Sequence, residues 1–465
     1  MELKVKYQYT YFIKPFLIEE KKYEKYLLSL IKNKNCKLKI FEKERDLNLY
    51  SYFIKNIREY FFPTFEFDKE RIRDFDSMID SLKAKKLSKL HCNIFEYNFS
   101  TRIQGKIDEN EGIFFNIDKI EIVCLDTGVC FLVIKTNLEN SENFSELLNF
   151  NYKFKDINSD FSKLREFNNI KIQTDKFNNM NELSKFIDNI IGVKNNSIGL
   201  KDIDLYNKRF FVYTYSCIDQ DAWNNEEDFK NIQGDFLKYS NVLSNNNTID
   251  LNLKELDKNI QNIEQFKYSR FGFTKQSASL ITSSIDINNY TKLLFDYENE
   301  YLYTLLISLY QRIYLKKLEN NFKSKKDINK VRDKFLKFTK EIWLNEITNS
   351  LTGTIFYNKW REVFELQEIY DEIKNRYDVI YKDLKIEKNN KDSKVIWFIL
   401  LISILLNVFN LITMMRLKWN LWRKNENTLW YRYNRNRQNK RINRKIRRKV
   451  CKPSFYTCWN RVLWK

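Results

Sequence analysis

One stretch of 21 residues, Val395–Met415, contains no charged side chain and constrains what the rest of the chain can be. At about 1.5 Å per residue, a helix of this length is about 30 Å long, which matches the hydrocarbon thickness of a bilayer. Lys391 and Lys394 precede the stretch, and Arg416 and Lys418 follow it. Because a buried helix of a water-soluble protein normally has a polar face, we predict a transmembrane helix at 395–415.

The net charge of +20 is concentrated after this stretch. Residues 416–465 hold 17 Lys and Arg but a single acid, Glu426, and so contribute +16 of that charge. The nearly neutral remainder disfavours nucleic acid as a partner of the body of the chain. The first residues are charged and lack the apolar run of a signal peptide. We therefore expect an inner-membrane protein whose large N-terminal domain is cytoplasmic.

Residue types that carry catalysis or hold metal ions are scarce. His91 is the single histidine, and the 7 cysteines include no Cys-x-x-Cys pair. One histidine disfavours Ser–His and Cys–His catalysis and excludes metal clusters built on several histidines. We interpret His91 as structural or exposed, and we expect reduced thiols in a cytosolic domain. The sequence predicts no enzyme, no disulfide and no bound cofactor.

Hydrophobic periodicity predicts a mixed α/β cytosolic domain at 1–248. Alternating residues predict strands at 4–13 and 209–215, and a hairpin at 112–137 that turns at Asp126-Thr127-Gly128. Helical spacing predicts helices at 20–32, 140–151 and 160–168. The overall expectation is an α+β fold followed by long α-helices and a C-terminal transmembrane helix.

Helical periodicity dominates from about Ile249, so we predict a stalk region of long helices at 249–394. The helices fall at 290–322 and at 330–360, with an interruption near Gly353. Spacings of 4, 3, 4, 3 and 4 then form a coiled-coil seam of Leu366, Tyr370, Ile373, Tyr377, Ile380 and Leu384. This seam either packs within one subunit as an antiparallel hairpin or forms a self-associating stalk.

The order of these parts resembles the CorA-like metal-ion channel superfamily, and several stretches look like a divergent bacterial group within it. The stretches are VCLDTGVCFLVIKTNL (123–138), RFGFTKQSASLIT (270–282), YLYTLLISLYQRIYLKKL (301–318) and the segment 335–373. The resemblance covers roughly 110–415. It implies a pentamer in the lipid bilayer, with Mg²⁺ as the transported ion. It also implies an alternative function, because some members of the group accompany type III CRISPR systems as membrane effectors. A nucleotide second messenger opens these effectors.

The chain departs from this superfamily after the first membrane helix. The Gly-Met-Asn signature and the second membrane helix are both missing. Residues 416–465 instead hold 10 Arg, 5 Trp and no Gly, whereas the 415 residues before them hold 12 Arg, 4 Trp and 8 Gly. A one-base slip of the reading frame in A/T-rich codons explains this change. Read one base early, the Glu codon GAA becomes the Arg codon AGA when an A precedes it. The Gly codon GGA becomes the Trp codon TGG when a T precedes it. We hypothesise that the tail is the frameshifted remnant of a second membrane helix.

A genuine basic, aromatic tail that binds nucleic acid or anionic lipid is the rival interpretation of 416–465. It would make the chain a membrane-anchored interaction protein. Topology disfavours this interpretation, because a single span with a cytoplasmic domain would place +16 outside the cell, against the positive-inside rule.

Polar residues inside the predicted span identify its functional face. Ser403, Asn407, Asn410 and Met414 share one side of the helix. Their side chains either line a pore or form hydrogen bonds between helices, and both readings require self-association. The resemblance also points to Lys275, Gln276, Gln311 and Arg312 as contacts for an anionic ligand, although salt bridges and hydrogen bonds are their ordinary role. We expect an oligomeric channel for divalent cations with a ligand-sensing domain.

Overall fold

The computed structural model confirms a sheet-rich N-terminal region, long helices and an apolar helix near the C-terminus. Two compact units, Met1–Asp378 and Val379–Lys465, make up the chain and are described separately. The structure describes residues 3–99, 103–107, 112–139, 142–156, 170–174, 177–192, 209–245, 257–258, 260–263, 266–323 and 328–443.

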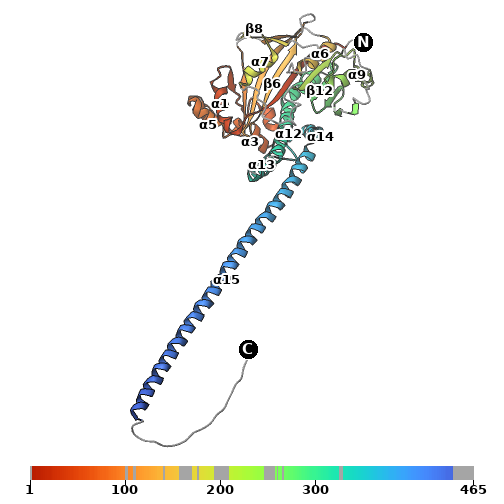
Figure 1. The fold of residues 1–465 in the computed structure, drawn as a ribbon. Coiled ribbons are helices and arrows are strands. Elements are labelled where there is room, and N and C mark those ends of the chain that lie inside the picture. The colour runs from red at the N-terminus through yellow and green to blue at the C-terminus, as the bar shows by residue number, and fades with distance from the viewer. Residues whose placement is uncertain are drawn as a thin grey trace. The chain divides into compact units, whose positions relative to one another are not determined.

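Within the described residues, a 12-stranded sheet forms the core of the first unit (Figure 1). The strand order is β10-β11-β12-β9-β1-β6-β5-β4-β7-β8, and β2 and β3 pair beside β5. Neighbouring strands are antiparallel except β9 and β12, which are parallel. The strands predicted at 4–13 and 209–215 are confirmed as β1 and β9. The bounds are β1 Val5–Leu17, β2 Cys36–Leu38, β3 Cys92–Tyr97, β4 Ile103–Ile107, β5 Ile113–Leu125, β6 Val129–Leu138, β7 Ile170–Thr174, β8 Phe177–Glu182, β9 Phe211–Ile218, β10 Gln261–Ile263, β11 Ser269–Phe273 and β12 Ser277–Ser283.

Helices predicted at 20–32, 140–151 and 290–322 are confirmed, with shifted ends, whereas 160–168 lies outside the described residues. The helices are α1 Tyr23–Lys32, α2 Leu47–Tyr52, α3 Lys55–Phe61, α4 Lys69–Ser77, α5 Asp80–Leu87, α6 Phe144–Phe154, α7 Leu183–Ile191, α9 Phe229–Ser240, α11 Lys292–Asp296, α12 Leu302–Lys323, α13 Ile328–Glu341, α14 Leu351–Val363 and α15 Leu366–Asn443. A π-helical turn, Tyr297–Tyr301, joins α11 to α12.

Side chains of the central strand β1 alternate between two layers of helices. On one face Phe12 packs against Phe150 and Phe154 of α6, with ring centroids 5.7 and 4.1 Å away. On the other face Tyr11 donates a 2.5 Å hydrogen bond to Glu298, in the π-helical turn before α12. Helices therefore cover both faces of the sheet (Figure 1), which explains why the side chains of β6 and β9 are almost entirely buried.

The hairpin predicted at 112–137 is confirmed as β5 and β6. Its turn depends on Gly128, which has a φ of +79°. A Cβ at this position would collide with the carbonyl oxygen of Ile18, so both the backbone conformation and the space available require glycine. Ile18 N in turn donates a 2.8 Å hydrogen bond to Gly128 O, which ties the end of β1 to the turn.

The expectation of helical structure from Ile249 is wrong between Gln261 and Ser283, where the chain forms β10, β11 and β12. The sheet therefore crosses the boundary predicted at 248/249. Serines in β12 hide the strand pattern, because buried hydrogen bonds replace apolar contacts: Ser279 Oγ lies 2.6 Å from the Oγ of Ser240 on α9. Gly272 of β11 faces the same serines, and a Cβ there would clash with them.

The predicted helix at 330–360 is interrupted, but the position expected near Gly353 is wrong. The interruption spans 342–350, between α13 and α14. Gly353 instead lies in the first turn of α14, where its N–H donates to the Ser350 side chain that caps the helix. Glycine is needed there because the Tyr52 hydroxyl occupies the space of a Cβ.

The first half of the predicted seam packs within its own chain. Leu366 and Ile373 are fully buried in the first unit. Tyr370 stacks on Trp343, with ring centroids 4.4 Å apart and planes at 3°. Packing within one subunit is therefore confirmed for residues 366–373. The side chains of Ile380 and Leu384 lie outside the described residues.

Candidate functional site: the apolar segment and the base of the long helix

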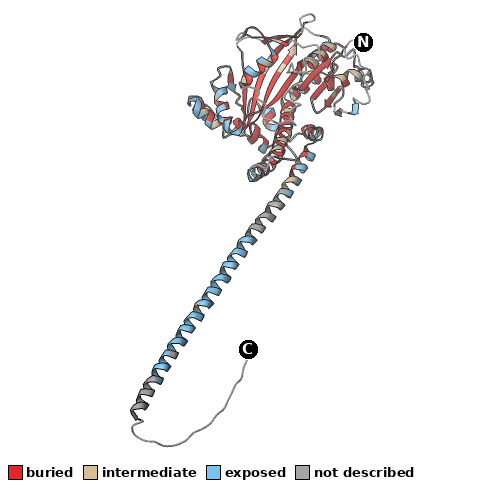
Figure 2. Cartoon of the chain, viewed as in Figure 1, coloured by how far each residue is buried: buried red, intermediate tan, exposed pale blue. Residues whose placement is uncertain are grey.

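The helix α15 contains a segment, Ser393–Tyr433, that is long and apolar enough to cross a membrane. Within it, every side chain from Val395 to Ile412 is exposed, as the pale blue of α15 in Figure 2 shows. Trp397 and Phe398 are 69% and 66% exposed, values that water would penalise for large apolar side chains. The segment therefore presents a long, exposed apolar surface within the described residues.

A polar stripe interrupts this apolar surface, as predicted from the spacing. Ser403, Asn407, Asn410 and Met414 follow one another at intervals of 4, 3 and 4 on a continuous helix, so they lie on one face. All four are exposed. Thr413, beside the stripe, donates its hydroxyl to the backbone oxygen of Asn410 at 2.8 Å. Among the described residues, no hydrogen bond engages the amides of Asn407 and Asn410, which are therefore available to groups outside the chain.

Three of the four predicted ligand residues lie near the two-residue turn between α14 and α15. Lys275 Nζ, from the turn between β11 and β12, lies 2.6 Å from the Oε1 of Glu365. Arg312 of α12 donates a 2.9 Å hydrogen bond to Phe364 O and stacks over the Phe364 ring. Gln276 neighbours Lys275, and its carbonyl accepts a hydrogen bond from the backbone of β9.

Gln311 has a different environment from the other three predicted ligand residues. Its side chain is fully buried. Its amide nitrogen donates to Ile342 O at 3.0 Å and to the hydroxyl of Tyr357 at 2.9 Å. These bonds join α12 to the end of α13 and to α14, so this glutamine holds the helices together and does not reach solvent.

Glu365 was not predicted from the sequence, yet it is the centre of this turn. Its φ of +52° is a left-handed conformation, which is uncommon for a residue with a Cβ. The hydrogen bond from Lys275, followed by the charges of Lys275, Arg312 and Lys316, lowers the pKa of its carboxyl below the usual 4.5. The charges of three cations thus act on one carboxylate at this turn, and Lys275 contacts it directly.

A second ion pair lies further along the base of α15, the name used here for residues 366–378. Glu319 of α12 is 3% exposed. Its carboxylate lies 3.0 Å from Lys316 and 3.6 Å from Arg376 of α15. Together with the buried Leu366 and Ile373, this pair attaches the first three turns of α15 to the first unit.

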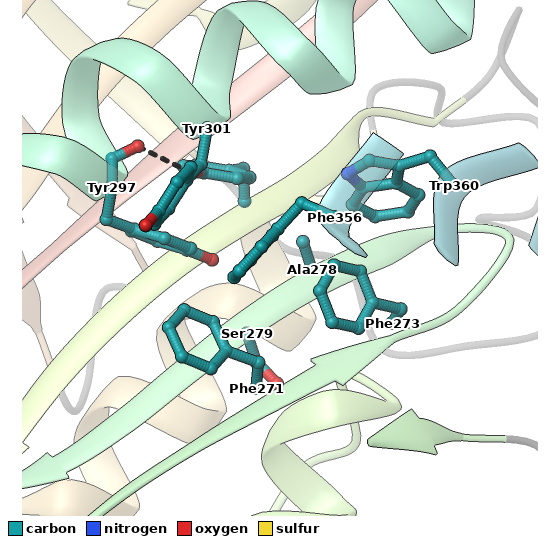
Figure 3. Close-up of a pocket in the computed structure, with 9 residues that line it drawn as sticks. Phe271, Phe273, Ala278, Ser279, Tyr297, Tyr301, Phe356 and Trp360 are labelled. Atoms are coloured by element: carbon teal, nitrogen blue, oxygen red, sulfur yellow. Dashed lines mark hydrogen bonds between the residues drawn. The ribbon is translucent and has the colours of Figure 1, made fainter. Parts of the chain in front are cut away.

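Aromatic side chains fill the space between the sheet edge and α14. Figure 3 shows the rings of Phe271, Phe273, Tyr301, Phe356 and Trp360 in contact across β11, the π-helical turn and α14. Tyr301 stacks on Phe356 with centroids 4.2 Å apart, and Phe273 meets Trp360 edge to face at 4.9 Å. These rings leave no room for a water molecule, so β11, the π-helical turn and α14 are closely packed against one another.

The role of Glu298 was not predicted from the sequence, and His91 was interpreted only as structural or exposed. Glu298 in the π-helical turn lies 2.6 Å from Lys135 and so connects the sheet to α12. His91 Nδ1 lies 2.8 Å from Asp126, and its ring stacks on Tyr60 at 4.4 Å. No group of three or more His, Cys, Asp or Glu side chains in the described part of the chain is arranged to hold a metal ion.

Comparison with protein-family models, with curated proteins and with solved structures finds no match for this chain. The CorA-like resemblance therefore stays a prediction.

Proposed function

We propose that this chain is a membrane-anchored protein that self-associates through α15 and forms a cation channel, with a regulatory domain on the cytoplasmic side. The observation that supports this most strongly is the polar stripe of Ser403, Asn407 and Asn410 within an otherwise apolar and wholly exposed segment. Asparagine amides facing lipid are costly, whereas amides facing a second copy of the helix form hydrogen bonds worth about 1 kcal/mol each.

The same stripe supports a pore. A ring of asparagine amides from several copies would replace part of the hydration shell of an ion, while the opposite apolar face would contact lipid. We propose a divalent cation, with Mg²⁺ first, on the CorA-like resemblance alone, and the same resemblance suggests five copies. In a frame-restored protein, the second helix would give this pore its outer support.

Ion flux through reconstituted protein tests this proposal. The full chain and the frame-restored chain are placed in vesicles that contain a Mg²⁺-sensitive dye. We expect flux well above that of empty vesicles in at least one of the two proteins. Replacing both Asn407 and Asn410 by leucine should reduce this flux more than ten-fold, whereas Leu405→Ala on the opposite face should leave it unchanged. Absent flux in both proteins, or flux that the double replacement leaves intact, contradicts the channel proposal.

A membrane effector opened by a nucleotide is the second candidate function. The observation that favours it is the convergence of Lys275, Arg312 and Lys316 around a single carboxylate at the base of α15, because clustered cations attract phosphates. Transport-deficient cells discriminate between the two functions. Growth rescued by the frame-restored protein at low Mg²⁺ supports the transporter, whereas flux that appears only after a nucleotide is added supports the effector.

A further inference from the structure

Phe364 and Glu365 form the turn that connects α14 to α15. Glu365 adopts a left-handed conformation with a φ of +52°, which side chains with a Cβ adopt rarely. Two contacts from distant segments accompany this conformation. Lys275 Nζ lies 2.6 Å from Glu365 Oε1, and Arg312 donates a 2.9 Å hydrogen bond to Phe364 O. We call these two interactions the Glu365 contact.

The Glu365 contact is accessible to solvent, unlike the apolar packing that follows it. The side chains of Lys275 and Glu365 are 48% and 51% exposed, so dissolved ions reach them. Leu366 and Ile373 are both fully buried, and dissolved ions cannot screen that packing. The base of α15 is therefore held by an ion pair whose strength depends on salt and by apolar packing whose strength does not.

The charges around the turn are unbalanced. Lys275, Arg312 and Lys316 all act on the Glu365 carboxylate. Lys316 also pairs with Glu319, at 3.0 Å. An added anion would therefore meet three cations and two carboxylates, those of Glu365 and Glu319, and it would compete with Glu365 for Lys275. Losing Lys275 would remove the ion pair that opposes relaxation of the left-handed residue.

We propose that the Glu365 contact is a releasable attachment that controls how firmly residues 366–378 pack on the first unit. Charge neutralisation, or competition by an anion for Lys275, opens it, and the first turns of α15 then loosen from α12 and α13. The proposal concerns the first unit alone. Its use in channel gating rests on the proposed function.

Hydrogen exchange in the full chain, held in detergent, measures this packing directly. Lys275→Gln and Glu365→Asn each remove one partner, and asparagine tolerates the left-handed conformation. At low ionic strength we expect backbone amides of 366–378 to exchange about three-fold faster in each variant, which is the range of an exposed ion pair. The double variant should be no faster than either single variant. High salt should remove the difference from the unmodified chain.

Glu362→Gln is the matched control. Glu362 is an exposed acid of α14 whose carboxylate pairs with Lys359 at 3.0 Å. The replacement keeps its backbone carbonyl, which accepts a 3.0 Å hydrogen bond from Glu365 N, so it should leave exchange of 366–378 unchanged. Inorganic pyrophosphate at low ionic strength is the anion probe, and it should accelerate exchange in the unmodified chain but not in Lys275→Gln.

Several results would overturn the proposal: additive effects of the two replacements, unchanged exchange in both, an equal effect in the control, or no response to pyrophosphate. Failure of the span to self-associate would leave these exchange results standing, so the two proposals fail independently.

Discussion

Removing the carboxylate of Glu121 should destabilise the first unit by about 3 kcal/mol. Glu121 on β5 is 1% exposed, and its Oε1 lies 2.7 Å from Lys39 and 2.9 Å from Lys119. Lys39 is itself 16% exposed, and it reaches the Tyr303 hydroxyl of α12 at 3.3 Å. Glu121→Leu leaves this lysine in a poorly hydrated position, and breaking a buried ion pair on one side costs about 3–5 kcal/mol.

Two features place the expected loss at the lower end of that range. Glu96 remains 3.5 Å from Lys39, and Lys119 is 34% exposed and can turn to water. The shift in the pKa of Glu121 gives the same magnitude for the loss of stability. Although burial alone would raise it, the charges of Lys39 and Lys119 lower the pKa of Glu121 from 4.5 to about 2, which corresponds to about 3 kcal/mol at 1.36 kcal/mol per pKa unit.

Urea unfolding of the full chain in detergent, followed by tryptophan fluorescence, measures this loss. The apolar double variant Lys39→Met with Glu121→Leu should be more stable than Glu121→Leu alone, because it leaves no buried charge unpaired. Because the folded-state pKa is depressed, the contribution of Glu121 is present above pH 4.5 and disappears as the pH falls through about 2. A single variant that loses less than about 1 kcal/mol, or a double variant less stable than the single, would refute this reasoning.

Three further predictions concern a titrating carboxylate, a turn and the tail. Burial, and then the charge of Asp296, raises the pKa of Glu300 from 4.5 to about 7, so its ionisation lowers stability as the pH rises from 4.5 through 7. Glu300→Gln should therefore raise the free energy of unfolding at pH 8 by about 1 kcal/mol after solvent screening, and by nothing at pH 4; equal effects at both pH values in urea titrations would contradict this. Gly128→Ala should cost more than about 2 kcal/mol in the same titrations, because of its positive φ and the carbonyl of Ile18, and a neutral effect would show that the turn relaxes. Sequencing the DNA that encodes residues 414–419 should reveal a one-base difference from related genes, and relatives that read this same frame without any such difference would exclude the frameshift.

Strong periodicity made much of the fold predictable. Alternation identified β1, a two-sided apolar run identified the β5–β6 hairpin, and helical spacing identified α12. The same rules missed β12, because its buried serines are satisfied by hydrogen bonds with Ser240 of α9 that no sequence pattern shows. They also misread Gly353, which marks a close approach of Tyr52 and not the end of a helix.

The candidate site was predictable only in part. The span and its stripe follow from local spacing, so Asn407 and Asn410 could be named from the sequence. Glu365 could not, because its role depends on a left-handed backbone and on Lys275, which is 90 residues away. Gln311 was named as a ligand contact, yet it is buried, because a sequence pattern cannot separate a buried polar contact from a surface one.

Cysteine crosslinking of the span in membranes tests the central claim most directly, that copies of α15 meet through the polar stripe. Cysteines replace Ser403 and Met414 on the stripe, and Leu405 and Ile412 serve as controls on the opposite face at similar depth. The tail cysteines Cys451 and Cys458 are first replaced by serine. After mild oxidation, the account predicts disulfide-linked dimers for the two stripe positions and none for the two controls. Equal crosslinking on both faces, or none on the stripe, would contradict it.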